Sequence, residues 1–145
     1  MTQYIAPLRD MQFVLHELLE VERALKPMPE HTDVDTDTIN QVLEEAGKFC
    51  SEILLPLNQI GDRQGCTHHE DGSVTTAKGF KEAYRQYIDA GWPALACDPQ
   101  YGGQGLPIVL NNALYEMLNS ANQAWAMYPG LSNGAYHCLH LAGAP

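Results

Sequence analysis

The chain has 145 residues, 45% of them hydrophobic, and its 18 Asp and Glu against 8 Lys and Arg give a formal net charge of −10. This length and composition are typical of one globular domain that can bury a core. The charge has the wrong sign for a protein that binds nucleic acid or an anionic membrane by neutralising phosphates, so we expect neither partner.

The first helical pattern covers residues 10–25, where Asp10 is a plausible N-cap and the apolar residues recur three and four apart. Pro27 and Pro29 follow directly and would end this helix. We therefore expect one helix over residues 10–25.

The strongest pattern covers residues 36–60, where apolar side chains, Cys50 among them, form a single stripe at helical spacing. Asp35 or Asp37 would cap its start. Pro56 lies inside the pattern and lacks a backbone N–H, so we expect a kink or a break between residues 52 and 56.

Turn residues separate the next two helices. Residues 66–75 contain Asp-Gly-Ser and are expected to form a loop with a tight turn, after which Thr76 can cap a helix that Gly91 ends. Residues 91–107 carry three prolines and four glycines, which indicates a fixed bend with closely approaching backbone.

Two further helices are expected after this bend. Pro107 fits the first turn of one of them. The other would start at Ser132 or Asn133, beyond Tyr-Pro-Gly at residues 128–130. No segment alternates convincingly between apolar and polar residues, so the predicted fold class is all-α.

Several residue groups could carry chemistry but have simpler explanations. His68, His69 and nearby Cys66 are metal-ligand types, yet adjacent residues rarely point at one ion, so a solvated loop is favoured. His137 and His140 are three apart on a helix but lack a third ligand, which favours a packed or interface role. We therefore predict no metal site.

The glycines of the bend, at positions 102, 103 and 105, could suggest phosphate binding at a helix start, but the spacing of a dinucleotide fingerprint is missing. A structural turn is favoured. For one aromatic group the core and an acyl-binding pocket are equally good locations. Its members are Trp92, Tyr101, Trp125 and Tyr128.

Cysteine usage and the absence of targeting signals suggest where the protein works. The four cysteines, at positions 50, 66, 97 and 138, are unevenly spaced and form no Cys-x-x-Cys, so we expect reduced thiols without a structural zinc. The first ten residues lack the pattern of a secretion signal, and no apolar run approaches the roughly 20 residues of a membrane span. We expect a cytoplasmic protein.

The order of several short motifs resembles the N-terminal region of acyl-CoA dehydrogenases of the larger bacterial type. The resemblance covers essentially the whole chain. Its motifs are Tyr4-x-Ala6-Pro7-Leu8-x-Asp10-Met11-x-Phe13, Gly61-Asp62-Arg63-x-Gly65, Asp71-Gly72-Ser73-Val74, Gly79-Phe80-Lys81-Glu82-Ala83-Tyr84 and Tyr101-Gly102-Gly103-x-Gly105.

This resemblance implies an N-terminal extension with a helix over residues 1–30 and the helical N-terminal domain of the family over residues 31–145. In the family, FAD lies between this domain, a small β domain and a C-terminal helical domain. A glutamate of the C-terminal domain removes the α-proton of an acyl-CoA while the β-hydride passes to the flavin. Electron-transfer flavoprotein and a homo-oligomeric assembly are the partners implied.

No catalytic or cofactor-binding residue carries over from the family, because no position of this chain matches those motifs. We therefore expect a part of a larger enzyme that is inactive alone. By position, four residues are expected to help wall the acyl pocket: Trp125, Tyr128, Leu131 and Ala135. The alternative is a stand-alone helical protein-interaction module, which should bury its apolar stripes within itself. A small metal-binding or catalytic bundle would need convergent titratable groups.

Overall fold

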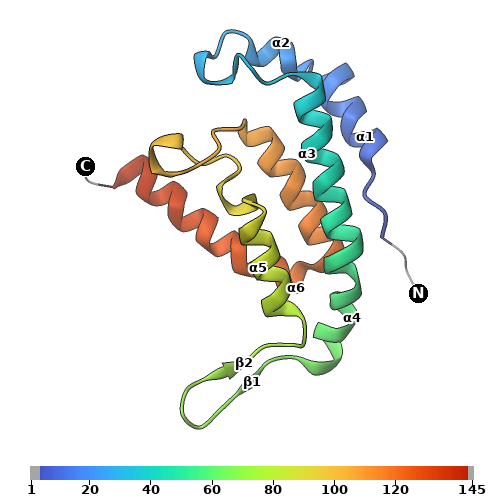
Figure 1. The fold of residues 1–145 in the computed structure, drawn as a ribbon, viewed down its shortest axis with the longest axis vertical. Helices are drawn as coiled ribbons and strands as arrows, with labels where there is room; N and C mark the ends of the chain where they lie inside the picture. The colour runs from blue at the N-terminus through green and yellow to red at the C-terminus, as the bar shows by residue number, and fades with distance from the viewer. Residues whose placement is uncertain (1–3, 144–145) are drawn as a thin grey trace.

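Helices make up most of the computed structural model, which describes residues 4–143 (Figure 1). This confirms the all-α prediction. The α-helices are α1 (Leu8–Gln12), α2 (Val21–Leu25), α3 (Thr36–Lys48), α4 (Leu55–Gln64), α5 (Phe80–Asp89) and α6 (Ile108–Ala142). The π-helical segments are η1 (Phe13–Leu18) and η3 (Phe49–Leu54), and the 3-10 turns are η2 (Pro29–His31), η4 (Trp92–Ala94) and η5 (Pro99–Tyr101).

The long stripe predicted from residue 36 onward is confirmed as the continuous run α3, η3 and α4. Asp35 caps it, because its carboxylate accepts a hydrogen bond of 2.8 Å from the Thr38 N–H. The irregularity expected near Pro56 takes the form of the wide π-helical turns of η3, and Pro56 itself lies in the first turn of α4. The stripe is fully buried at Ile39, Leu43, Ala46, Cys50 and Leu54.

The single helix expected over residues 10–25 is wrong. The chain starts α1 directly after Pro7, so Asp10 lies within the first turn and is not the cap. It then breaks at Glu20, which has a left-handed φ of 44°. In one straight helix Leu15 and Val21 would lie about 120° apart around the axis. The break turns both side chains into the core, where they are buried.

Residues 66–75 form a short antiparallel hairpin where we expected only a loop. Strands β1 (Thr67–His68) and β2 (Val74–Thr75) are too short to show an alternating pattern. The predicted tight turn is present, since the Asp71 carboxylate accepts from the Ser73 N–H at 2.9 Å. The hairpin extends away from the helices (Figure 1).

The cap predicted at Thr76 is also wrong, because a turn from Ala77 to Phe80 comes before the helix. The Phe80 N–H donates to the Ala77 carbonyl at 3.2 Å, and α5 begins after Gly79, whose φ is 88°. At the other end of α5, Gly91 adopts a φ of 78° just beyond the last turn, as predicted.

The break in the C-terminal helical region lies at Asn122, about ten residues before the predicted start at Ser132 or Asn133. Pro107 directly precedes α6, and Asn122 is the residue inside α6 that leaves helical geometry, with φ −160° and ψ 84°. Pro129 lies within the second half and is buried. Figure 1 shows the two halves of α6 running in different directions from this corner.

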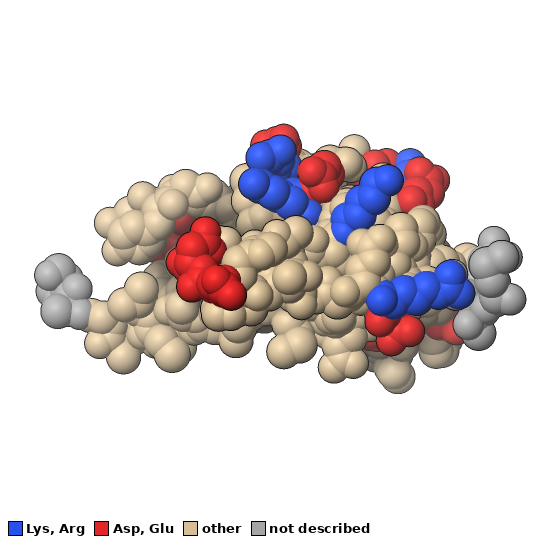
Figure 2. Space-filling view, turned by 90° about the horizontal axis from the view of Figure 1, so that it is seen from below, with Lys and Arg blue, Asp and Glu red and all other residues tan. Residues whose placement is uncertain are grey.

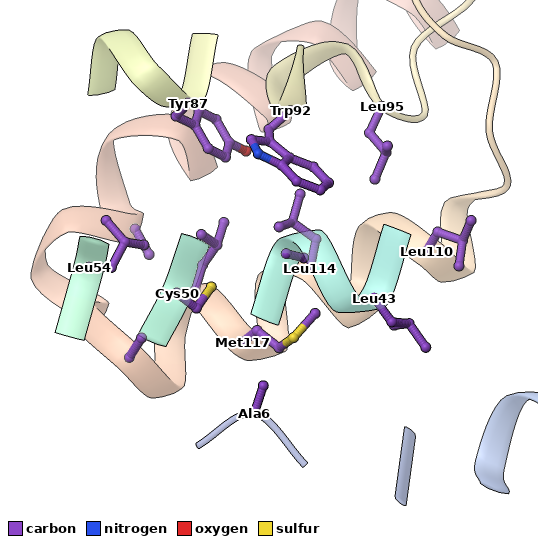
Figure 3. Packing of buried hydrophobic residues seen from close by; sticks show 14 of the residues in the cluster. Ala6, Leu43, Cys50, Leu54, Tyr87, Trp92, Leu95, Leu110, Leu114 and Met117 are labelled. Atoms are coloured by element: carbon purple, nitrogen blue, oxygen red, sulfur yellow. The ribbon is translucent and has the colours of Figure 1, made fainter. Parts of the chain in front are cut away.

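The core lies between α3, α5 and the first half of α6. Figure 3 shows Tyr87 and Trp92 on one side, Leu43 and Cys50 in the middle, and Ala6 of the N-terminal segment on the opposite side. Within the described residues, none of the helices is both long enough and apolar enough to cross a bilayer.

Candidate functional site

A mostly apolar groove of about 610 Å³ lies between the base of the hairpin, the start of α5 and the second half of α6. Its polar groups are Thr76, Lys81 and Ser132, and all three belong to its lining. The remaining lining residues are apolar or aromatic: Val74, Phe80, Tyr84, Tyr128 and Leu131. The groove therefore offers a mostly apolar surface with one positively charged side chain, that of Lys81.

Tyr128 and Phe80 connect the two helices that form the groove. Their rings meet edge to face, with centroids 6.5 Å apart and planes at 84°. The Tyr128 hydroxyl lies 3.9 Å from the Sγ of Cys66, and burial together with this thiol raises the pKa of Tyr128. Leu131, about one turn further along α6, is 75% exposed.

Trp125 lies behind the groove, where it is fully buried. Its indole Nε1 donates a hydrogen bond of 3.2 Å to the Phe80 carbonyl. Its ring centroid lies 5.3 Å from that of Tyr87 and 6.1 Å from that of Tyr84. Trp125 therefore belongs to the core and holds the residues that line the groove.

The four residues named from the sequence thus occupy three different places. Tyr128 and Leu131 line the groove, Trp125 lies behind it, and Ala135 is exposed further along α6, outside this lining. The assignment from sequence missed the contribution of α5. Phe80 and Tyr84 are four residues apart in a predicted helix and so lie on one face of it, which was the signal that could have placed them together.

The other residue groups considered from the sequence lie away from this groove. His69 is on the exposed hairpin, with its Nε2 2.7 Å from the Thr75 Oγ1. On α6 the His140 ring stacks on Tyr136, with centroids 5.4 Å apart. Trp92 is in the core and Tyr101 is exposed. Within residues 4–143, no three His, Cys, Asp or Glu side chains come together in a way that could hold a metal ion.

The cysteines are unpaired in the described structure. Cys50 is buried as its stripe position predicts, and burial raises the pKa of its thiol to about 12. Cys138 lies in an apolar stretch of the sequence, but its side chain is exposed.

The glycine bend has the geometry of a structural turn. Gly102 and Gly105 have φ values of 82° and 67°. At Gly103 the reason is close approach, because a Cβ there would lie 2.0 Å from the carbonyl oxygen of Cys97. The positive φ values at two of these positions and the close approach at the third each exclude larger side chains. Phosphate binding is therefore not needed to explain the glycines.

The second half of α6 exposes large apolar side chains that nothing in the described chain covers. The exposed fractions are 61% for Met127, 72% for Leu139 and 81% for Leu141. Residues 117–145 contain no Asp, Glu, Lys or Arg. In Figure 2 the left end of the molecule, where α6 ends, is accordingly mostly uncharged.

Comparison with known proteins found no matching family model. Curated relatives do match. The chain is 36% identical over 141 residues to 3-methylmercaptopropionyl-CoA dehydrogenase of Ruegeria pomeroyi, covering 97% of this chain and 24% of that protein. It is 32% identical over 142 residues to the broad-specificity linear acyl-CoA dehydrogenase FadE5 of Mycobacterium tuberculosis, covering 97% of this chain and 23% of the relative. A butyryl-CoA dehydrogenase of Syntrophomonas wolfei is 28% identical over 134 residues, 91% of this chain and 22% of its own length. The chain thus spans about a quarter of the length of these relatives.

Proposed function

Because the chain is homologous over about 97% of its length to the N-terminal quarter of acyl-CoA dehydrogenases, we propose that it is the helical N-terminal part of such an enzyme. The reaction would be the α,β-dehydrogenation of an acyl-CoA thioester. In this proposal the groove between α5 and α6 helps wall the pocket for the acyl chain. The observation that carries the pocket role is the apolar lining contributed by Phe80, Tyr84, Tyr128 and Leu131.

The lining has the chemistry that an acyl chain requires. Each methylene moved from water into an apolar site contributes about 0.8 kcal/mol, or about a fourfold change in affinity. Tyr128 and Leu131 would supply contact surface, and the thioester end would lie outside this apolar wall. Ala135 would contact the acyl chain from further along α6, and Trp125 would support the wall from within the core.

The same lining does not fit a flavin. A dinucleotide needs several donors for its phosphates, whereas the groove offers one cation, Lys81, and the hydroxyls of Thr76 and Ser132. FAD, which would accept the β-hydride in the complete enzyme, is therefore assigned no contact with these residues. None of these residues is assigned the role of the catalytic base either. We accordingly propose that the 145-residue chain by itself neither retains flavin nor oxidises acyl-CoA.

The apolar side chains exposed on α6 favour this proposal over a self-contained interaction module. Such a module should bury its stripes, but Met127, Leu139 and Leu141 face solvent in the chain alone. Electron-transfer flavoprotein, a homo-oligomer and a cytoplasmic location belong to the same proposal and rest on the homology alone.

A chimaeric enzyme tests the proposed function. The aligned residues of the Ruegeria dehydrogenase are replaced by this chain, and bound flavin is measured by its absorbance before and after an acyl-CoA is added without oxygen. The expected result is a flavoprotein whose flavin bleaches with acyl-CoA. A folded chimaera that binds flavin but is not reduced by any acyl-CoA would contradict the proposal.

A further inference from the structure

The corner in α6 is built around one buried amide side chain. Asn122 is only 1% exposed and takes an extended conformation, which starts the second half of α6 as an N-cap. Its Oδ1 accepts from the Trp125 N–H at 3.1 Å, and its Nδ2 donates to the Leu54 carbonyl at 3.2 Å. One side chain therefore fixes the corner both to the next turn of α6 and to the junction of η3 with α4.

Trp125 continues this connection to the groove. Its backbone is held by Asn122, and its indole Nε1 donates to the carbonyl of Phe80 at the start of α5. The Phe80 ring in turn contacts Tyr128 across the groove. Hydrogen bonds of buried groups are costly to lose, because the remaining partner is left without water. The connection thus joins both walls of the groove to the core.

We propose that Asn122 and Trp125 are positioning residues that set the separation of Phe80 and Tyr128, and so the width of the groove. The acyl ligand of that groove rests on the proposed function above, whereas the positioning itself is a property of this chain. Without the Asn122 cap, the second half of α6 would be free to rotate about the corner. Without the indole bond, α5 would move independently of α6.

Nuclear magnetic resonance on the 145-residue chain tests the positioning directly. The readouts are the nuclear Overhauser effect between the Phe80 and Tyr128 rings and the exchange rate of the Trp125 indole N–H. Asn122→Ala is expected to abolish the ring-to-ring effect and to speed indole exchange about tenfold. Leu118→Ala is the matched control, because Leu118 is buried in the first half of α6 but lies outside this connection. It should leave the ring-to-ring effect unchanged, although its cavity lowers overall stability and so speeds indole exchange.

Two further variants keep the test decisive if Asn122→Ala unfolds. Trp125→Phe keeps an aromatic ring and the Asn122 cap but removes the indole donor, so the Phe80–Tyr128 effect should weaken while the cap stays formed. Asn122→Asp restores the donor to Leu54 only when its buried carboxyl is protonated, so the effect should return as the pH falls from about 8 to 6. Wild type is measured over the same range.

The outcomes separate this proposal from the proposed function. If Asn122→Ala and Trp125→Phe both keep the ring-to-ring effect, as Leu118→Ala does, the positioning role is overturned. Octanoyl-CoA is then added to the wild-type chain, and the resonances of Tyr128 and Leu131 are followed. Absence of any shift would count against acyl binding in the groove but would leave the positioning result standing.

Discussion

Replacing Gly103 by alanine should damage the glycine bend far more than the same change at its neighbour. A Cβ at Gly103 would lie 2.0 Å from the oxygen, 2.2 Å from the carbonyl carbon and 2.7 Å from the Cβ of Cys97. The first two atoms belong to the backbone and cannot rotate away. The Gly103 N–H also donates to the Asp98 carbonyl at 3.0 Å, so any shift strains that turn as well.

The size of the effect follows from comparing two glycines. Overpacking a fitted site costs about 1–3 kcal/mol, and a clash with fixed backbone belongs at or above the upper end of this range. Gly102 has a φ of 82°, but a Cβ there would meet nothing within 4 Å. Gly102→Ala should therefore cost only the left-handed conformation, about 1–2 kcal/mol.

Urea unfolding followed by circular dichroism measures both variants against wild type. We expect the Gly103→Ala midpoint to fall well below that of Gly102→Ala. The midpoint of thermal unfolding should also be about 6–12 °C lower for Gly103→Ala than for wild type, because a loss of about 3 kcal/mol lowers it by roughly 2–4 °C for each kcal/mol. Equal losses at the two positions would refute the close-approach argument and leave backbone conformation as the reason for both glycines.

Two other predictions concern pH and association. Burial raises the pKa of Glu22, but the hydrogen bonds it accepts, from Thr36 and His16 among others, outweigh burial and leave the pKa below its ordinary 4.5. The contribution of Glu22 to stability should thus be complete above about pH 4.5 and be lost on acidification. Glu22→Gln should therefore flatten the fall in unfolding free energy between about pH 5 and 3. If the unfolding free energy of Glu22→Gln falls as steeply with pH as that of wild type, this prediction is contradicted. The apolar side chains exposed on α6 should make the wild-type chain self-associate. The double variant Leu131→Ser with Leu139→Ser should reduce this association in sedimentation without loss of stability, because both side chains are exposed. A wild-type chain that is strictly monomeric would contradict this prediction.

The parts of the fold that sequence predicted are those decided by local chemistry. Asp35 caps α3 because its carboxylate reaches an N–H three residues on, and Gly91 ends α5 because it tolerates a positive φ. The corner in α6 was misplaced because Tyr-Pro-Gly is a strong local stop signal, whereas part of what fixes Asn122 is its bond to the Leu54 carbonyl, which is distant in sequence. The break at Glu20 likewise has its effect in the packing, since Leu15 before it and Val21 after it are both buried.

The candidate site shows the same division. The resemblance to the family suggested Tyr128 and Leu131 by position, and both line the groove, but it could not show that Trp125 points into the core. That orientation depends on the Phe80 carbonyl, which is 45 residues away in sequence. The contribution of Phe80 to the groove could not be assigned either, because helical periodicity identifies an inner face without saying which element it meets.

The chain-length preference of the chimaeric enzyme tests the central claim most directly. Flavin bleaching is measured with straight acyl-CoAs of increasing length for Leu131→Trp, which would fill the groove, and for Leu139→Trp, a leucine equally exposed on α6 but outside the lining. We predict that Leu131→Trp shifts kcat/KM toward shorter chains, by about fourfold for each methylene excluded, and that Leu139→Trp leaves the preference unchanged. Identical preferences for both variants would contradict the claim that this groove walls the acyl pocket.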